Sequence, residues 1–279
     1  MYKILVDSCG ELSEEMRAGG HFVNIPLILR VDNEEIVDDE SFDQKTFLAK
    51  VASSSNEPKS ACPSPDAYMK WMEGKSDHIY IVTLSSKLSG SYASASLGKE
   101  LYEEEYGDAK KIHVFDSRSA SIGESLIGLK IEELEEEGLP FEEVVSQTQD
   151  YIEKQHTFFV LETLETLRKS GRLSGLAATI IKALNIKPVM GSTEEGSIQK
   201  LGQERGMTRA LMKMVRCLME VTPDPQNRVL AIAHCNCPER AQMVKAQVEK
   251  LAHFKKILIL DTAGVSSMYA NDGGIIMAG

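Results

Sequence analysis

Short apolar runs alternate with amphipathic segments along the first half of the chain. β-branched and aromatic residues dominate these runs, as is typical of buried parallel strands, and the runs lie at 2–6, 78–84 and 111–116. Helix formers fill the segments after Ser13, from about Asp43, from Pro65, in "SYASASLGKELYEEEY" and in two long stretches separated by "GLP". In between, "HFVNIPLILRV" predicts extended chain before a turn at "DNEE", and "SSSNEPKSACPSP" predicts a loop. The alternation predicts a doubly wound parallel sheet.

The pattern changes after about residue 155. The segment "TFFVLETLETLRKSGRLSG" predicts a strand, a short helix and a basic turn, and "IKPVMGSTEEGSIQKLGQE" predicts a hairpin closed by "EEGS". A helix is expected over about 206–221, and "RVLAIAHC" and "KILILDT" predict strands on either side of another helix. Strands paired by hairpins beside a few helices are typical of an α+β domain with a mainly antiparallel sheet. For 279 residues we expect an α/β domain over 1–155 and a smaller α+β domain over 156–279.

The overall charge argues against nucleic acid as a partner. The chain has a formal net charge of -11 and a pI near 5.2, and it has no basic stripe interleaved with aromatic residues. Its longest apolar runs, such as "VLAIA", are strand-sized and far too short to span a membrane, which leaves only peripheral membrane contact open. The opening "MYKILVDS" begins a strand at once, without a charged leader and an apolar core. We therefore expect a cytoplasmic protein.

Motifs for metals, cofactors and nucleophilic catalysis are missing from the sequence. Five dispersed cysteines favour a reducing compartment over a disulfide framework. The stretch "HCNC" at 234–237 lacks the spacing and the second ligand pair of a zinc site, and a strand end running into a helix at Pro238 explains it better. No nucleotide-binding loop, dinucleotide fingerprint or H-E-x-x-H occurs, and "SSKLSGS" is not a G-x-S-x-G elbow. We expect no metal, no cofactor and no catalytic residue.

A hydroxyl-rich loop stands out at 83–95, "TLSSKLSGSYASA". It lies between a predicted buried strand and a predicted helix. In an open α/β sheet, ligands collect outside the carboxyl ends of the strands, where the free amides of the next helix also face outward. Anions suit such a position. The loop is therefore the first candidate for a binding site.

Several separated segments together resemble the DegV family of fatty-acid-binding proteins. They keep their order over nearly the full chain, and five in register are far more specific than one. The matching segments are "ILVDSCGEL" at 4–12, "KSACPSP" at 59–65, "LSSKLSGSYASA" at 84–95, "VFDSRSASIG" at 114–123 and "LETLRKSGRLSG" to "IKPV" from 161 to 189, which runs on through "GSIQKLGQERG" at 196–206.

The resemblance implies a two-domain protein that binds one long-chain fatty acid in a tunnel between its domains. It also implies a partner, because characterised bacterial members carry the lipid for a separate fatty acid kinase subunit, which phosphorylates the carboxylate. Burying about ten methylenes at about 0.8 kcal/mol each would contribute about 8 kcal/mol to binding, so the head group needs positioning more than attraction. An enzyme acting on a small carboxylate or acyl phosphate, or a lipid-sensing regulator, are the alternatives.

Two loops match the segments that hold the carboxylate in this family. In the serine-rich loop the resemblance assigns Ser89, Gly90 and Ser91 to fatty acid binding, although Ser89 could instead cap the following helix. In the earlier loop the family pattern Thr-Ser-Gln-Pro is replaced by "SACP", so Ser60 keeps a hydroxyl and Ala61 offers only its amide. A polar turn fixed by two prolines would also explain that loop.

The final segment departs from the family pattern. Members of the family often carry a histidine before a Gly-Pro-Gly turn, whereas this chain has "YANDGGIIMAG", which places Asn271 at that position. Asparagine donates a hydrogen bond but cannot become cationic near neutral pH. We assign Asn271 to the fatty acid site, with a tight turn as the alternative.

Two arginines are candidates for docking the kinase subunit. Arg172 and Arg205 lie in the segments whose arginines face the kinase in the family, and they stand in basic turns of an otherwise acidic chain. Rim arginines would steer an acidic partner surface. Solubility and helix C-capping are the alternatives. We expect both arginines near the mouth of the tunnel, without contact to the carboxylate.

Overall fold

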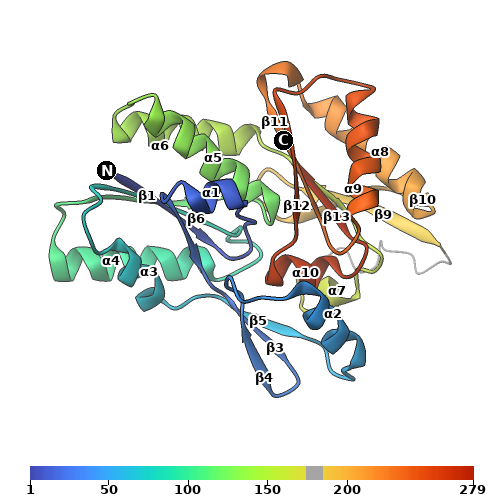
Figure 1. Ribbon diagram of the computed structural model, residues 1–279, viewed down its shortest axis with the longest axis horizontal. Coiled ribbons are helices and arrows are strands. Elements are labelled where there is room, and N and C mark those ends of the chain that lie inside the picture. Colours follow the sequence, from blue (N-terminus) through green and yellow to red (C-terminus); the bar gives the residue numbers. More distant parts are fainter. Residues whose placement is uncertain (174–184) are drawn as a thin grey trace.

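The structure, a computed structural model, describes residues 1–173 and 185–279 (Figure 1). The first half contains β1 (Tyr2–Asp7), α1 (Glu14–Ala18), β2 (Phe22–Ile25), β3 (Ile28–Val31), β4 (Glu34–Val37), α2 (Gln44–Ser53), β5 (Lys59–Ala61), α3 (Pro65–Met72), β6 (His78–Thr83), α4 (Ser91–Tyr106), β7 (Lys111–Asp116), α5 (Ile122–Glu136) and α6 (Phe141–Lys154). The second half contains β8 (Thr157–Val160), α7 (Glu165–Lys169), β9 (Ile186–Ser192), β10 (Ile198–Arg205), α8 (Met207–Val221), η2 (Pro225–Asn227), β11 (Val229–His234), α9 (Pro238–Glu249), β12 (Lys256–Asp261), α10 (Gly264–Ala270) and β13 (Ile275–Ala278).

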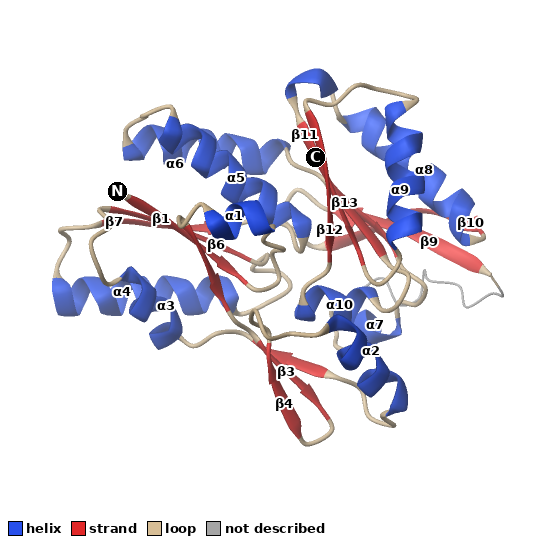
Figure 2. Ribbon diagram, in the orientation of Figure 1, coloured by secondary structure: helices blue, strands red, loops and turns tan. Residues whose placement is uncertain are grey.

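The first sheet is parallel and doubly wound, as the sequence predicts. Its four strands run in the order β2-β1-β6-β7. Apolar side chains of α1, α5 and α6 cover one face, and those of α3 and α4 cover the other (Figure 2). Burial on both faces explains why β1 and β6 are continuous apolar runs rather than alternating ones.

The second sheet is mainly antiparallel, which confirms the predicted fold class. Its six strands run in the order β10-β9-β8-β13-β11-β12, and of its pairings only β11 with β12 is parallel among the described residues. Helices α8 and α9 bury their apolar stripes on one face. The predicted hairpin is β9 with β10, and the predicted strands around α9 are β11 and β12.

A third, small sheet was not expected from the sequence. Pro26 divides the predicted extended segment into β2 and β3, and β3 leaves the main sheet to pair antiparallel with β4 and β5. The segment predicted as a loop after α2 therefore contains a strand of three residues, Lys59–Ala61. This sheet projects from the body next to α2 (Figure 2). Its strands are too short and too polar to produce a clear alternation.

Helix α5 joins the two main sheets, because it packs on both. One side contributes Ile127 and Ile131 to the core of the first sheet, and Ile122 and Leu126 pack against β11 and β13 of the second. The expected boundary at residue 155 falls in the connection between α6 and β8. The division into two domains stays a prediction.

The remaining expectations concern membranes and metals. Along the parts of the chain that the structure describes, no helix is long and apolar enough to cross a membrane. The "HCNC" stretch is the end of β11 followed by α9, which begins at Pro238, as expected. Within residues 1–173 and 185–279, no group of three histidine, cysteine or acidic side chains is placed to hold a metal ion.

Candidate functional site

The serine-rich loop follows β6 and is held tightly by its own backbone and by its neighbours. The amides of Leu88 and Ser89 both donate to the carbonyl oxygen of Ser85, at 2.9 and 3.1 Å, which folds the loop into a compact turn before α4. The amide of Leu84 donates to Asp7 Oδ2 at 2.8 Å. Asp7 ends the adjacent strand β1. The carboxyl ends of two neighbouring strands are thus fixed to each other.

Ser89 has the structural role that the sequence left open, and its binding role stays a prediction. Its Oγ atom accepts the amide of Ser91 at 3.2 Å and lies 3.1 Å from Ser91 Oγ, so it satisfies one of the free amides at the start of α4. The N-cap position itself is Gly90. Ser89 also lines a cavity. Its hydroxyl lies on the cavity wall and shares a hydrogen bond with Ser91 Oγ in which either atom can be the donor.

The cavity lies where the loops of the first sheet meet the second half of the chain. It encloses about 840 Å³ of space between atoms, part of it open to solvent, and its accessible lining is predominantly apolar. The first half supplies loops after β1, β6 and β7, and the second half supplies β8, α10 and the β9–β10 turn. Its lining includes Leu27, Leu84, Leu88, Phe159, Leu161, Leu167, Ile198, Val265, Ala270 and Ile276 as apolar residues, with Cys9, Ser60, Ser89, Arg118, Ser119, Ser121, Thr157, Arg172, Ser192, Ser197, Ser266 and Tyr269 as polar or amphipathic ones.

Three of the predicted residues meet at this cavity. Ser60 Oγ lies 3.3 Å from the hydroxyl of Tyr269, and the Arg172 guanidinium carbon lies 5.3 Å from the centre of the Tyr269 ring. Arg172 Nε also donates to the carbonyl oxygen of Leu88 at 3.1 Å, next to Ser89 in the chain. Tyr269 therefore connects Ser60 to the predicted docking arginine, and Arg172 in turn connects Tyr269 to the serine-rich loop. No feature of the sequence singled it out.

The other predicted ligand residues are not part of the lining. Ala61 is exposed in β5, Ser91 is fully buried behind Ser89, and Gly90 faces Cys62. Asn271 ends α10 in a turn with a φ of 56°, and its side-chain amide donates to the carbonyl oxygen of Tyr269 at 3.0 Å. This geometry suits the tight-turn alternative. Their binding roles stay predictions.

Arg205 does not line the cavity. It is the exposed last residue of β10, whereas Ile198, the first residue of that strand, lines the cavity. Seven steps of extended chain separate these two residues by about 23 Å. Arg205 instead borders a shallow depression with Gly206 and Arg209 at the start of α8. Its docking role stays a prediction.

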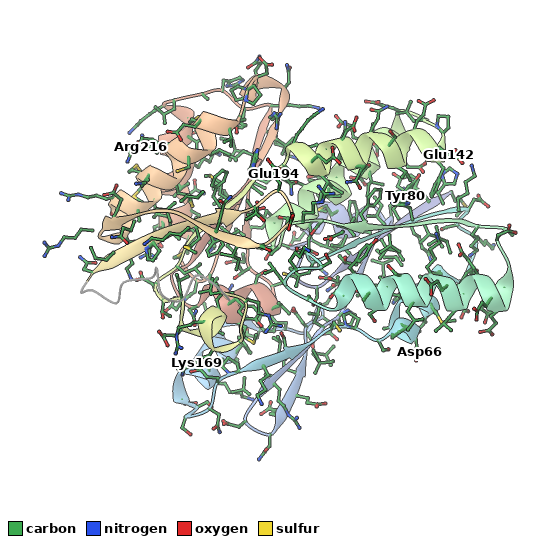
Figure 3. The ribbon with its side chains drawn as sticks, turned by 180° about the vertical axis from the view of Figure 1, so that it is seen from behind. Asp66, Tyr80, Glu142, Lys169, Glu194 and Arg216 are labelled. Atoms are coloured by element: carbon green, nitrogen blue, oxygen red, sulfur yellow. The ribbon has the colours of Figure 1, made fainter. Side chains whose placement is uncertain are left out.

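Arg118 is a second cavity arginine, and the sequence did not single it out. It follows β7 with a φ of 50°, and its guanidinium lies 3.5 Å from the carbonyl oxygen of Glu194 in the β9–β10 turn. Figure 3 shows Glu194 near the middle of the molecule, where the second sheet meets α5. Ser85 Oγ donates to the carbonyl oxygen of Gly196 in the same turn at 2.8 Å. The turn thereby joins the two halves beside the cavity.

Four carboxyl groups are buried beneath the cavity and were also missed. Asp7, Glu11, Asp38 and Glu124 are at most 3% exposed. Asp38 accepts hydrogen bonds from Ser8 Oγ and from the amides of Gly264 and Val265, all at 2.7–2.8 Å, and so fixes the start of α10. Burial raises the pKa of Asp38 to about 6 and that of Glu11 to about 7, although hydrogen bonds oppose the shift in both.

Comparison with known proteins agrees with this geometry. A model of the DegV family, described as uncharacterised, matches residues 1–278. A DegV domain-containing protein of Streptococcus pneumoniae is 36% identical over 256 residues, which cover 92% of this chain and 90% of the relative.

Two solved structures are similar over essentially their whole length. A DegV family protein of Ruminococcus gnavus, solved with vaccenic acid, is 50% identical with a TM-score of 0.97, covering 100% of this chain and 99% of that one. The fatty acid kinase B3 protein of Streptococcus pneumoniae, loaded with linoleic acid, is 33% identical with a TM-score of 0.89, covering 100% and 98%. From its sequence, its two sheets and these matches, the chain belongs to the DegV family.

Proposed function

We propose that this protein binds one long-chain fatty acid in the cavity, with the carboxylate at Ser60 and Ser89. The observation that carries the proposal is the cavity itself, which combines a largely apolar lining with hydroxyl groups on its wall. The two similar proteins solved with vaccenic and linoleic acid support the same ligand class.

The chemistry of the wall suits an amphiphile better than a small polar ligand. Leucine, isoleucine, valine and phenylalanine side chains would remove the methylenes of the tail from water. Ser60, Ser89 and Tyr269 would supply neutral hydroxyl donors to the head, and Arg172 lies directly behind the Tyr269 ring. Neutral donors hold a carboxylate without a direct ion pair.

The finer part of the proposal is that the bound carboxylate is presented to a fatty acid kinase subunit. The similarity to the fatty acid kinase B3 protein supports it. Arg172, which is partly exposed at the cavity wall, would lie at the contact, and Arg205 would belong to a more distant part of the same surface. The chain itself would provide no catalytic group.

Two measurements test the proposal in order. Denaturing mass spectrometry of the purified protein should detect a co-purified long-chain fatty acid. Its tail should have at least the roughly ten methylenes that supply about 8 kcal/mol of binding free energy. Titration of delipidated protein with hexanoate and hexadecanoate should then favour the longer acid by several orders of magnitude, because each methylene adds about 0.8 kcal/mol. Equal and weak binding of both acids would contradict the proposal.

The kinase step needs a separate assay. Lipid-loaded protein, a bacterial fatty acid kinase catalytic subunit and ATP should yield acyl phosphate, detected as the hydroxamate after reaction with hydroxylamine. The same mixture with the lipid-free protein is the control. Tight lipid binding without acyl phosphate would retain the binding role and remove the kinase role.

A further inference from the structure

The floor of the cavity is built on Glu11. Ser121 Oγ lies 2.9 Å from both carboxyl oxygens of Glu11, so its hydroxyl donates to that carboxyl. The Ser266 hydroxyl lies next to the same carboxyl and donates to the carbonyl oxygen of Cys9 at 2.9 Å. Cys9, Ser121 and Ser266 all line the cavity. A charge placed in the cavity is therefore separated from Glu11 by a single layer of side chains.

Glu11 does not stand alone, because Glu124 from α5 and Asp7 from β1 lie behind it. Burial raises the pKa of Asp7, and the amides of Leu84 and Cys9, which donate to it at 2.8 and 3.1 Å, oppose that rise. Both carboxyl oxygens of Glu124 are buried, and neither has a hydrogen-bond partner of ordinary geometry among the described residues. A carboxylate without donors cannot remain charged in such a position. Glu124 is therefore neutral, whereas Asp7 has two amide donors that favour its charged form.

The groups that offset the remaining negative charge are mainly neutral. Hydroxyls and backbone amides hydrogen-bond Glu11 and oppose the rise in its pKa that burial causes. Asp38 accepts hydrogen bonds from one hydroxyl and two amides. The two cavity arginines are turned to other partners, Arg118 to a carbonyl of the β9–β10 turn and Arg172 to Leu88 and Tyr269. Additional negative charge in the cavity thus enters a region that already holds buried anions.

We propose that the protein takes up a proton when it binds the carboxylate of a fatty acid, and that Glu11 receives it. The inference rests on the proposed function and specifies how the same site responds to pH. Like charges within about 10 Å of each other, at an effective dielectric constant of about 20, repel enough to shift a pKa by about one unit. Of the four buried carboxyls, Glu11 is the one best placed to respond near neutral pH, because its pKa is already raised to about 7 by burial.

The sign of the pH dependence follows directly. Below about pH 6 Glu11 is protonated with or without ligand, so affinity is independent of this group. As the pH rises above about 7, the empty protein loses the proton and the ligand must restore it, so affinity falls by up to tenfold per pH unit until the pKa of the complex is passed. A glutamine at position 11 should keep the affinity found at low pH.

The first experiment is calorimetric titration of delipidated protein at pH 7.5 in buffers of different ionisation enthalpy, which gives the number of protons bound per ligand. Dodecanoate should take up about half a proton, because a one-unit shift from about 7 changes the protonated fraction by that amount. Dodecanamide, which has the same tail and a neutral head, should take up none. Binding of dodecanoate without proton uptake would overturn the inference.

Three comparisons locate the proton. Dodecanesulfonate, whose head stays charged at every pH, should show the same uptake, and absence of uptake with it would place the proton on the ligand instead. Glu11→Gln should abolish uptake, and uptake that persists in this variant would exclude Glu11.

If that variant does not fold, Ser121→Ala should move the pH of maximal uptake upward, since it removes a donor to the charged carboxyl. An unchanged profile would overturn the assignment. Failure of all these ligands to bind at any pH would instead contradict the proposed function.

Discussion

Arg172 stacks on Tyr269, with its guanidinium carbon 5.3 Å from the ring centre, and the Tyr269 hydroxyl lies 3.3 Å from Ser60 Oγ. A residue predicted to contact a partner is therefore part of the wall that surrounds the predicted head group. A change at Arg172 affects this wall and the outer surface together. Arg205, about 23 Å along β10 from the cavity-lining Ile198, belongs only to the outer surface.

Charge reversal at Arg172 and at Arg205 should have different effects on fatty acid affinity. Arg172→Glu should lower fatty acid affinity at least tenfold, because it places a carboxylate beside the bound one, and it should also abolish acyl phosphate formation. Arg205→Glu should leave affinity within twofold and lower only the kinase reaction. Titration and the hydroxamate assay measure the two effects. Unchanged lipid affinity in Arg172→Glu would mean that Arg172 does not influence the bound carboxylate and acts only on the outer surface.

Ser89 should contribute to ligand affinity more than to folding. Loss of one hydrogen bond to a charged acceptor costs about 1.5–3 kcal/mol, so Ser89→Ala should weaken fatty acid binding by about 10- to 100-fold. The amide of Ser91 loses its acceptor, which should lower the free energy of unfolding by about 1 kcal/mol.

The matched control for Ser89 is Ser86→Ala. Ser86 is an exposed serine of the same loop whose hydroxyl donates to Asp116 Oδ2, outside the cavity lining. It should leave affinity unchanged. A large loss of stability with normal affinity in Ser89→Ala would identify Ser89 as a structural cap only.

Gly196 should be the least replaceable residue of the β9–β10 turn. Its φ is 86°, and a Cβ atom there would clash with the Ser85 hydroxyl and lie 2.7 Å from Arg118 Cα. Gly138 has a similar φ of 77° but no described atom within 4 Å of its Cβ position. Both alanine variants carry the same backbone strain, so the difference between them isolates the contact. Gly196→Ala should be less stable than Gly138→Ala by about 1–3 kcal/mol in denaturant unfolding. Equal losses would mean that the turn can move away from the first sheet at little cost.

The buried Glu11 should make the folded state more stable in mild acid. Because its pKa rises from 4.5 to about 7 on folding, the native protein holds this proton more tightly than the unfolded chain. The resulting stability is fully present below about pH 4.5 and is lost as the pH rises through about 7, a change of about 3 kcal/mol. Glu11→Gln should lack this dependence. Urea unfolding of both proteins at pH 5 and pH 8 measures it, and parallel pH profiles would contradict it.

The parts of the fold that the sequence predicted are those with a dense local pattern. β6 and the centre of β1 are buried on both faces and form apolar runs, and the edge strand β7 still carries Ile112, Val114 and Phe115 in a short run that the pattern detects. The small sheet escaped because β5 has only three residues in a segment rich in serine and proline. Three residues are too few for a strand to be recognised from either its β-propensity or its alternation of apolar and polar residues.

The candidate site was predictable only where it is local in sequence. The loop after β6 combines hydroxyls with a position at the end of a strand, and Ser89 does line the cavity. Tyr269 and Arg118 reach the cavity through packing between distant elements, which no local pattern encodes. Glu124 on α5 was missed for the same reason: it faces the interior because both main sheets cover that helix.

Strand β13 follows every other strand of the chain but lies inside its sheet, paired with β8 on one side and β11 on the other. During synthesis, β8 and β11 therefore lack β13 as a pairing partner until residues 275–278 have been translated. Ile276, which lines the cavity, arrives in this last step. The lining of the cavity is therefore complete only after β13 has been translated and has inserted between β8 and β11.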